Sequence, residues 1–142
     1  MGNLSEHFNN GDFACKCQKC KGKGEFRFHL GLIGALELIA VNFKKTPHII
    51  LGYRCEDECE RLGISRKNYH ALGKAANFRI DGIAPAEIYK FALSIEELHG
   101  IGLNIADNFV HVDTRKTVRE EWVKDFDKYL PMTPDRKIKY LG

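Results

Sequence analysis

The chain has 142 residues, a formal net charge of +3, and 44% hydrophobic and 29% charged residues, values typical of one globular domain that buries a core without disulfides. No stretch approaches the roughly 20 apolar residues of a membrane span, and the N-terminus lacks the basic region and apolar core of a secretory signal. We therefore expect a single domain over residues 1–142 that is made in the cytoplasm and does not enter a membrane.

The first distinctive segment, residues 11–25, reads GDFACKCQKCKGKGE and predicts an ordered Cys-rich loop. It carries three of the five cysteines, Cys15, Cys17 and Cys20. In a reducing compartment such spacing more often binds a metal than forms disulfides, so we expect a structural metal site whose fourth ligand is Cys55 or Cys59. Reduced thiols and a single disulfide are the alternatives. A nucleic-acid-binding knuckle is disfavoured, because no aromatic residues interleave the lysines to stack on bases.

The next part of the chain predicts one long helix and one short strand. Apolar residues recur at helical spacing from residue 28 to 43, and Pro47 stops the pattern. We expect this helix to pack on the core. Residues 48–54, HIILGYR, predict a short buried strand. Residues 55–64, CEDECERLGI, predict a short helix or polar turn leading to the loop that holds His70.

Three further short strands are predicted in the second half. Residues 75–81 and 109–115 both alternate apolar and polar side chains, the pattern of a half-buried strand. Residues 100–104, GIGLN, predict another strand between them. The polar faces of the two alternating strands carry Asn77 and Arg79 on the first, and Phe109, His111 and Asp113 on the second.

Two helices complete the prediction. Residues 84–100 predict a helix: Pro85 suits a first helical turn, and apolar residues follow at helical spacing. Residues 117–142 form a tail whose apolar side chains predict an amphipathic helix ended by Pro131. The fold class is therefore α+β, with helices packed on one face of a small antiparallel sheet.

The other face of that sheet carries the residues for chemistry. Two histidines and one oxygen donor with an open fourth position describe a catalytic zinc site. His70, Asn77 and His111 supply such a set. The spacing alone leaves open that both histidines are ordinary core or surface residues, and the helix-borne HExxH pattern is absent.

A metal-activated water also needs a carboxylate to accept its proton. Asp107 is the first candidate for this role and Asp113 the second. Arg54, at the end of the first predicted strand, has a guanidinium that suits a substrate carboxylate or a developing oxyanion.

Five motifs appear in the order and rough spacing of a known family: LSEHFNNGDFACKC, GYRC, YHALGKAANF, GIGL and FVHVDTR. Together they span residues 4–115, and the chain resembles the zinc D-Ala-D-Ala carboxypeptidase-like peptidoglycan peptidases. That family includes phage endolysins and has the Hedgehog/DD-peptidase fold. The resemblance implies a Zn²⁺ cofactor held by His70, position 77 and His111, with Arg54 binding substrate.

Two departures from the family pattern concern the metal and the base. The family has aspartate where this chain has Asn77, and an amide oxygen is a weaker, neutral donor. An acidic residue commonly lies a few positions before the last histidine ligand. Here Asn108 lies three positions before His111, and Asp107 lies four before it.

The sequence therefore predicts a zinc metallopeptidase, a hydrolase that cleaves amide bonds of peptidoglycan stem peptides as a D-Ala-D-Ala carboxypeptidase or an endolysin-type endopeptidase. A catalytically degenerate binding domain of the same fold is the alternative. We expect a monomer whose partner is the cell wall rather than nucleic acid or membrane. Without a signal peptide, phage-type release would bring it to the wall.

Overall fold

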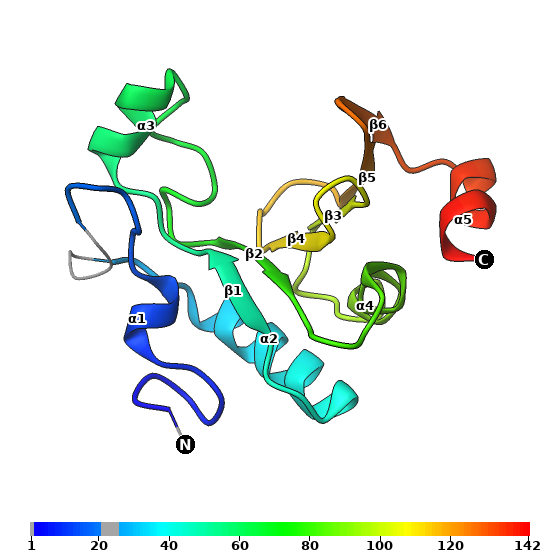
Figure 1. The fold of residues 1–142 in the computed structure, drawn as a ribbon, viewed down its shortest axis with the longest axis horizontal. Coiled ribbons are helices and arrows are strands. Elements are labelled where there is room, and N and C mark those ends of the chain that lie inside the picture. Colours follow the sequence, from blue (N-terminus) through cyan, green and yellow to red (C-terminus); the bar gives the residue numbers. More distant parts are fainter. Residues whose placement is uncertain (1, 21–25) are drawn as a thin grey trace.

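The computed structural model describes residues 2–20 and 26–142 and contains one six-stranded sheet (Figure 1). The strands lie in the order β1-β2-β4-β3-β5-β6. Their bounds are β1 His48–Leu51, β2 Ala75–Arg79, β3 Gly100–Asn104, β4 Phe109–Asp113, β5 Glu120–Asp125 and β6 Lys128–Pro131. All neighbouring strands are antiparallel except β3 and β5, which are parallel.

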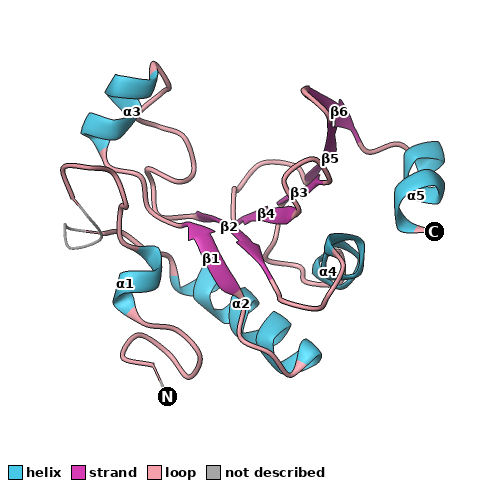
Figure 2. Ribbon diagram, in the orientation of Figure 1, coloured by secondary structure: helices cyan, strands magenta, loops and turns pink. Residues whose placement is uncertain are grey.

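Five helices occur within the described residues (Figure 2). They are α1 Asn10–Phe13, α2 Leu30–Phe43, α3 Glu56–Leu62, α4 Pro85–Ala92 and α5 Pro134–Leu141. Helix α3 lies at the β1 end of the molecule and α5 lies at the opposite end, beyond β6 (Figure 1). The predicted long helix is confirmed as α2, and of the short helix or polar turn predicted after the first strand, the helix is found as α3.

The core lies between the sheet and helices α2 and α4. Strand alternation places Phe78 of β2 with Val110 and Val112 of β4 on this face, and all three are fully buried. Helix α2 contributes Leu36 and Ile39, which are also fully buried. Because the core fixes which face each strand turns inward, the polar residues at alternate positions must lie on the other face.

The C-terminal helix predicted to end at Pro131 is wrong, because the only helix of the tail within the described residues, α5, begins after that proline. Residues 120–131 form the hairpin β5–β6, and only the last residues form a helix, α5. Val123 and Leu130 are cross-strand partners in this hairpin, and Phe126 at its turn has φ 57°. Val123 and Leu130 are seven residues apart, which also corresponds to two helical turns. The apolar spacing of this hairpin is therefore the same as that of an amphipathic helix.

The predicted sheet is antiparallel throughout. The observed sheet is mixed, because one pair of its strands is parallel. Strand β5 adds in parallel to the free edge of β3 and pairs Gly102 with Trp122. The α+β class itself is confirmed. Of the predicted Cys-rich loop, residues 11–13 belong to helix α1, and residues 21–25 lie outside the described residues.

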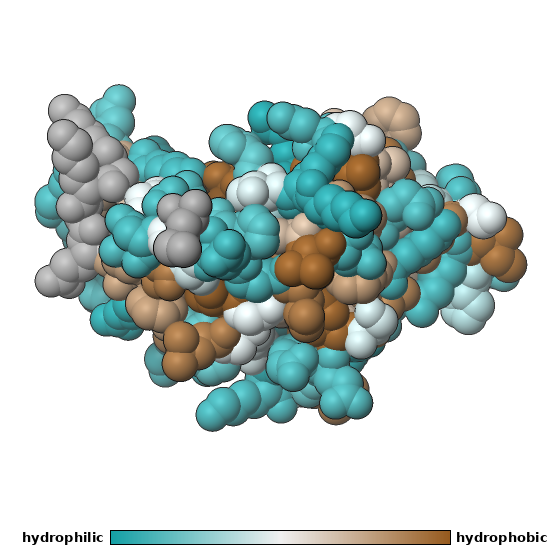
Figure 3. Space-filling view, turned by 90° about the horizontal axis from the view of Figure 1, so that it is seen from below, coloured by the Kyte–Doolittle hydropathy of each residue, from teal (hydrophilic) through white to brown (hydrophobic). Residues whose placement is uncertain are grey.

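No helix in the described ranges is long and apolar enough to cross a membrane. Seen from below, the surface is mainly hydrophilic, with apolar patches between the polar side chains (Figure 3). Val41 of α2 is among the exposed apolar side chains, at 64% exposure. Scattered apolar residues of this kind are ordinary on a protein surface.

Candidate active site

A cleft of about 310 Å³ lies on the face of the sheet opposite the core. All six strands contribute to its lining, as does the segment that follows β1. Among the predicted site residues, Arg54, His70, Asn77 and His111 line this cleft. The sequence therefore identified four residues that the fold brings to one place.

Asn77 and His111 are register partners on the antiparallel strands β2 and β4. The Nδ1 atom of His111 lies 2.8 Å from the Oδ1 atom of Asn77. The other ring nitrogen, Nε2, lies 2.7 Å from Oδ2 of Asp113. An ionised carboxylate only accepts hydrogen bonds, so Nε2 carries the proton that it donates to Asp113. In the neutral ring, the lone pair of Nδ1 then faces the Asn77 amide.

His70 lies in the turn before β2 and is 9% exposed. Its Nδ1 donates to the carbonyl oxygen of Gly52 at 2.9 Å, which leaves the lone pair on Nε2. The rings of His70 and His111 are 5.2 Å apart between centroids, at 74° to each other. Burial is the main cause that lowers the pKa of His70 to about 3, and the neighbouring His111 acts in the same direction. His70 is therefore a neutral imidazole at neutral pH, the form that binds metals.

Asp113 is fully buried and does not line the cleft. Arg115 donates to both of its carboxylate oxygens, from Nε at 2.8 Å and from Nη2 at 2.7 Å. Burial alone would raise the pKa of Asp113, but the hydrogen bonds from Arg115 and His111 outweigh it and hold that pKa well below its usual range. Asp113 thus orients the His111 ring as an ionised carboxylate.

Asp107 lies in the turn between β3 and β4, with 64% of its side chain exposed. It is absent from the cleft lining but contacts two residues that belong to it. Its Oδ2 lies 3.5 Å from Nδ2 of Asn104 and 3.9 Å from Nζ of Lys124. Among the described residues no carboxylate lines the cleft, and Asp107 stands at its rim.

Arg54 is the cationic side chain that follows β1. Its backbone N–H donates to the carbonyl oxygen of His70 at 3.3 Å. Its guanidinium lines the cleft and has no ion-pair partner within the part of the chain that the structure describes. A free guanidinium at a cleft wall is suited to bind an anionic group of a ligand.

The sequence interpretation missed Trp122 and Arg115. Trp122 reaches across β3 to His111, with ring centroids 5.2 Å apart. It can do so because Gly102 lies between them, where a Cβ atom would stand only 2.3 Å from the indole Nε1. Arg115 also stacks on the ring of Tyr69, 4.5 Å from its centroid. The glycine pattern in GIGLN was the signal for this space, since Gly100 makes the same room for Asp113.

The donor set in the cleft fits a divalent metal ion. One ring nitrogen of each histidine is held by an oxygen acceptor outside the cleft lining or on the backbone, Asp113 for His111 and the Gly52 carbonyl for His70, the arrangement usual around ligating histidines. The amide oxygen of Asn77 lies beside the His111 nitrogen. Two imidazoles and one oxygen match a zinc site that keeps a coordination position open.

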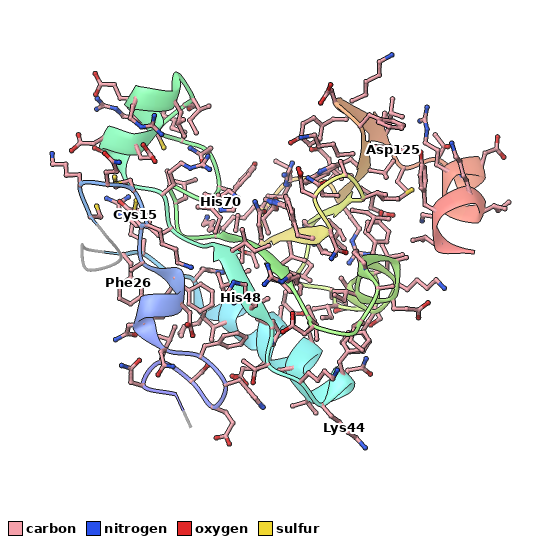
Figure 4. The ribbon with its side chains drawn as sticks, viewed as in Figure 1. Cys15, Phe26, Lys44, His48, His70 and Asp125 are labelled. Carbon is pink, nitrogen blue, oxygen red and sulfur yellow. The ribbon has the colours of Figure 1, made fainter. Side chains whose placement is uncertain are left out.

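A second group of metal-binding side chains lies near α3. The sulfur atoms of Cys15, Cys17, Cys20 and Cys55 all lie within 4.8 Å of one another. The predicted fourth member is thus Cys55, while Cys59 is buried beside Asn68 and outside the group. Figure 4 shows Cys15 near α3 and His70 toward the centre of the sheet, so the cysteine group is separate from the cleft.

Residues 33–122 match the protein family described as peptidoglycan L,D-endopeptidase MepK. The peptidoglycan L,D-endopeptidase MepK of Escherichia coli K12 is 41% identical over 76 residues, which cover 50% of this chain and 41% of that protein. The Shigella flexneri protein of the same name gives the same values. The probable peptidoglycan L,D-endopeptidase MepK of Haemophilus influenzae is 34% identical over 71 residues, 46% of this chain and 38% of that protein.

The chain thus spans about two fifths of the length of these curated relatives. No solved structure matches it, and the Hedgehog/DD-peptidase topology remains a prediction. The matched region contains the cleft residues His70, Asn77 and His111. The family resemblance inferred from the sequence motifs is confirmed, and the chain belongs to the peptidoglycan L,D-endopeptidase MepK family.

Proposed function

We propose that this chain is a zinc-dependent peptidase that cleaves amide bonds in the stem peptides of peptidoglycan. The family description supports an endopeptidase rather than a carboxypeptidase. The observation that carries the proposal is that two imidazoles and one amide oxygen line a cleft together with Arg54, which has no ion-pair partner among the residues that the structure describes. The peptide substrate and the zinc cofactor are both parts of this proposal.

His70, Asn77 and His111 would hold the metal, which supplies a Lewis acid and acidifies its bound water to a pKa of about 7. The chain's own groups prepare the donors. The Gly52 carbonyl fixes the proton of His70 on Nδ1, and the carboxylate of Asp113 fixes the proton of His111 on Nε2. These contacts favour the tautomers in which Nε2 of His70 and Nδ1 of His111 are the nitrogens that would bind the metal.

Arg54 and Asp107 would act on the substrate. The Arg54 guanidinium would bind a stem-peptide carboxylate and so place the adjoining amide over the histidines. The carboxylate of Asp107, at the rim beside Asn104 and Lys124, would accept the proton of the attacking water. Asp113 is the weaker candidate for that step, because its oxygens are buried and already bonded to Arg115 and His111.

The test is digestion of purified peptidoglycan, with the released muropeptides identified by mass spectrometry. We expect wild-type protein with zinc to release new peptide ends, and a chelator or His111→Ala to abolish that release. Arg54→Ala should raise KM more than it lowers kcat, because it removes substrate binding and leaves the histidines in place. A zinc-loaded chain that leaves stem peptides intact would contradict the proposal.

Zinc binding has its own reporter, because Trp122 is the single tryptophan and its ring is 5.2 Å from His111. Titration with zinc should change the Trp122 emission in wild type and leave it unchanged in His111→Ala. This measurement separates loss of metal from loss of catalysis. An emission spectrum that zinc does not alter in wild type would count against the three-residue site.

A degenerate binding domain is the second candidate, and Asn77 is the observation that favours it. An amide turned about its terminal bond offers an NH₂ donor to Nδ1 of His111, which satisfies both groups without a metal. An aspartate at this position cannot do so. If Asn77→Asp gains zinc binding and wall digestion from an inactive wild type, the natural chain is the binding domain; equal activity in both supports the peptidase.

A further inference from the structure

The four clustered cysteines come from two segments far apart in the chain. Cys15, Cys17 and Cys20 lie between α1 and the start of the undescribed residues, and Cys55 directly precedes α3. All five cysteines of the chain are free thiols in the structure. The Sγ atoms of Cys17 and Cys55 lie 3.8 Å apart, nearly twice the roughly 2.05 Å of a disulfide bond.

These distances match a tetrahedral tetrathiolate. Zinc–sulfur bonds of about 2.3 Å place the sulfurs of a regular tetrahedron about 3.8 Å apart. The Cys17–Cys55 separation has this value, and the whole set fits within 4.8 Å. Sulfur-only ligation selects soft ions such as zinc over magnesium or calcium.

Backbone N–H groups already point at three of these sulfurs. The N–H of Cys20 donates to Sγ of Cys17, that of Cys55 to Sγ of Cys15, and that of Glu58 to Sγ of Cys55, each at 3.4 Å. Such outer hydrogen bonds stabilise negative charge on thiolate ligands. Lys19 lies between two of the cysteines in the chain and pairs with Asp57 of α3, a further contact between the two segments.

We propose that Cys15, Cys17, Cys20 and Cys55 form a structural zinc site distinct from the cleft. The ion would tie the N-terminal segment to the short segment 52–55. That segment supplies the Gly52 carbonyl that holds His70 and the Arg54 side chain that lines the cleft. A second link already joins the same segments, since the Tyr53 N–H donates to the Phe13 carbonyl at 2.8 Å. The site is therefore a clamp on the cleft wall rather than part of the reaction.

The experiment replaces zinc by Co²⁺ in the 142-residue chain purified under reducing conditions. Four thiolates bound to Co²⁺ give intense sulfur-to-metal charge-transfer absorption in the near ultraviolet, which imidazole ligands do not give. We expect this absorption in wild type and in His111→Ala, with its intensity strongly reduced in Cys17→Ser. Cys59→Ser is the matched control, because Cys59 lies outside the group, and it should keep the full absorption.

A second measurement on the unchanged chain covers the case in which Cys17→Ser does not fold. Blocking the thiols of wild-type zinc protein with a mercurial should release about one zinc ion per chain, as one tetrathiolate site requires. Absence of the charge-transfer absorption, or no zinc release on thiol blocking, would overturn the cysteine site. Because His111→Ala affects the cleft alone, failure of the peptidase proposal would leave both of these results unchanged.

Discussion

The carboxylate of Asp113 offers the sharpest single test of how the cleft is built. It is fully buried and accepts hydrogen bonds from Arg115 and from Nε2 of His111. Asp113→Asn keeps the size of the side chain but removes its charge and turns one acceptor into a donor. One of the two partners must then face an NH₂ group in place of a carboxylate oxygen.

The loss of stability expected for Asp113→Asn follows from the burial of this carboxylate and from its ion pair with Arg115. Breaking a buried ion pair by removing one partner costs about 3–5 kcal/mol. Arg115 keeps a contact with Glu120, whose side chain is 64% exposed, so part of its charge stays compensated. We therefore expect a loss near the lower limit, about 3 kcal/mol in the free energy of unfolding. His111 loses its orienting acceptor as well, which should weaken zinc binding in the cleft by about 10–100-fold.

Urea unfolding measures the first effect, and a zinc titration followed by Trp122 emission measures the second. Asp127→Asn is the matched control, because Asp127 is exposed in the β5–β6 turn and should change stability by less than about 0.5 kcal/mol. If Asp113→Asn unfolds within about 1 kcal/mol of wild type, the buried carboxylate does not hold Arg115 and His111 as we describe.

Three further substitutions test other parts of the structure. Gly102→Ala puts a Cβ 2.3 Å from Nε1 of Trp122, so it should cost about 1–3 kcal/mol by overpacking and shift the Trp122 emission. Arg119→Met removes the donors to three backbone carbonyls after α4 and should lower the melting temperature. Glu37→Gln weakens hydrogen bonds from Ser5 and His7. Burial raises the pKa of Glu37, but these bonds outweigh it and leave that pKa lowered. The stability gained is therefore complete above the unfolded pKa of about 4.3 and lost as pH falls through the folded value, so the urea midpoints of Glu37→Gln and wild type should differ near neutral pH and converge in acid.

The positions of Asn77 and His111 could be predicted because one face of their strands is buried. Phe78 and Val110 are buried in the core. A shift of the strand register by one residue would bury the polar residues in their place. The alternation therefore fixes the face, and antiparallel pairing in register places the two residues opposite each other. The prediction of His70 depended on the family resemblance as well, because a histidine in a loop belongs to no periodic pattern that indicates the direction of its ring.

The parts that the sequence did not predict depend on partners far apart in the chain. No pattern in residues 120–125 indicates that β5 pairs in parallel with β3. Without that pairing, the position of Trp122 beside His111 cannot be predicted. The choice between Asp107 and Asp113 is of the same kind. Both lie near His111 in sequence, but Arg115 folds back to hold Asp113 in the interior while Asp107 remains in an exposed turn.

The two proposed metal sites share the segment 52–55, and this gives the cysteine group a physical reason to lie where it does. A cleft wall made from an irregular segment has no sheet ladder of its own to fix it, and β1 ends at Leu51. The Tyr53 N–H donates a hydrogen bond to the Phe13 carbonyl, and Cys55 belongs to the four-cysteine group. Arg54 is therefore fixed by its neighbours on both sides in the chain. Loss of the clamp should therefore displace Arg54 and weaken substrate binding, while Asn77 and His111, held by the sheet, keep their positions.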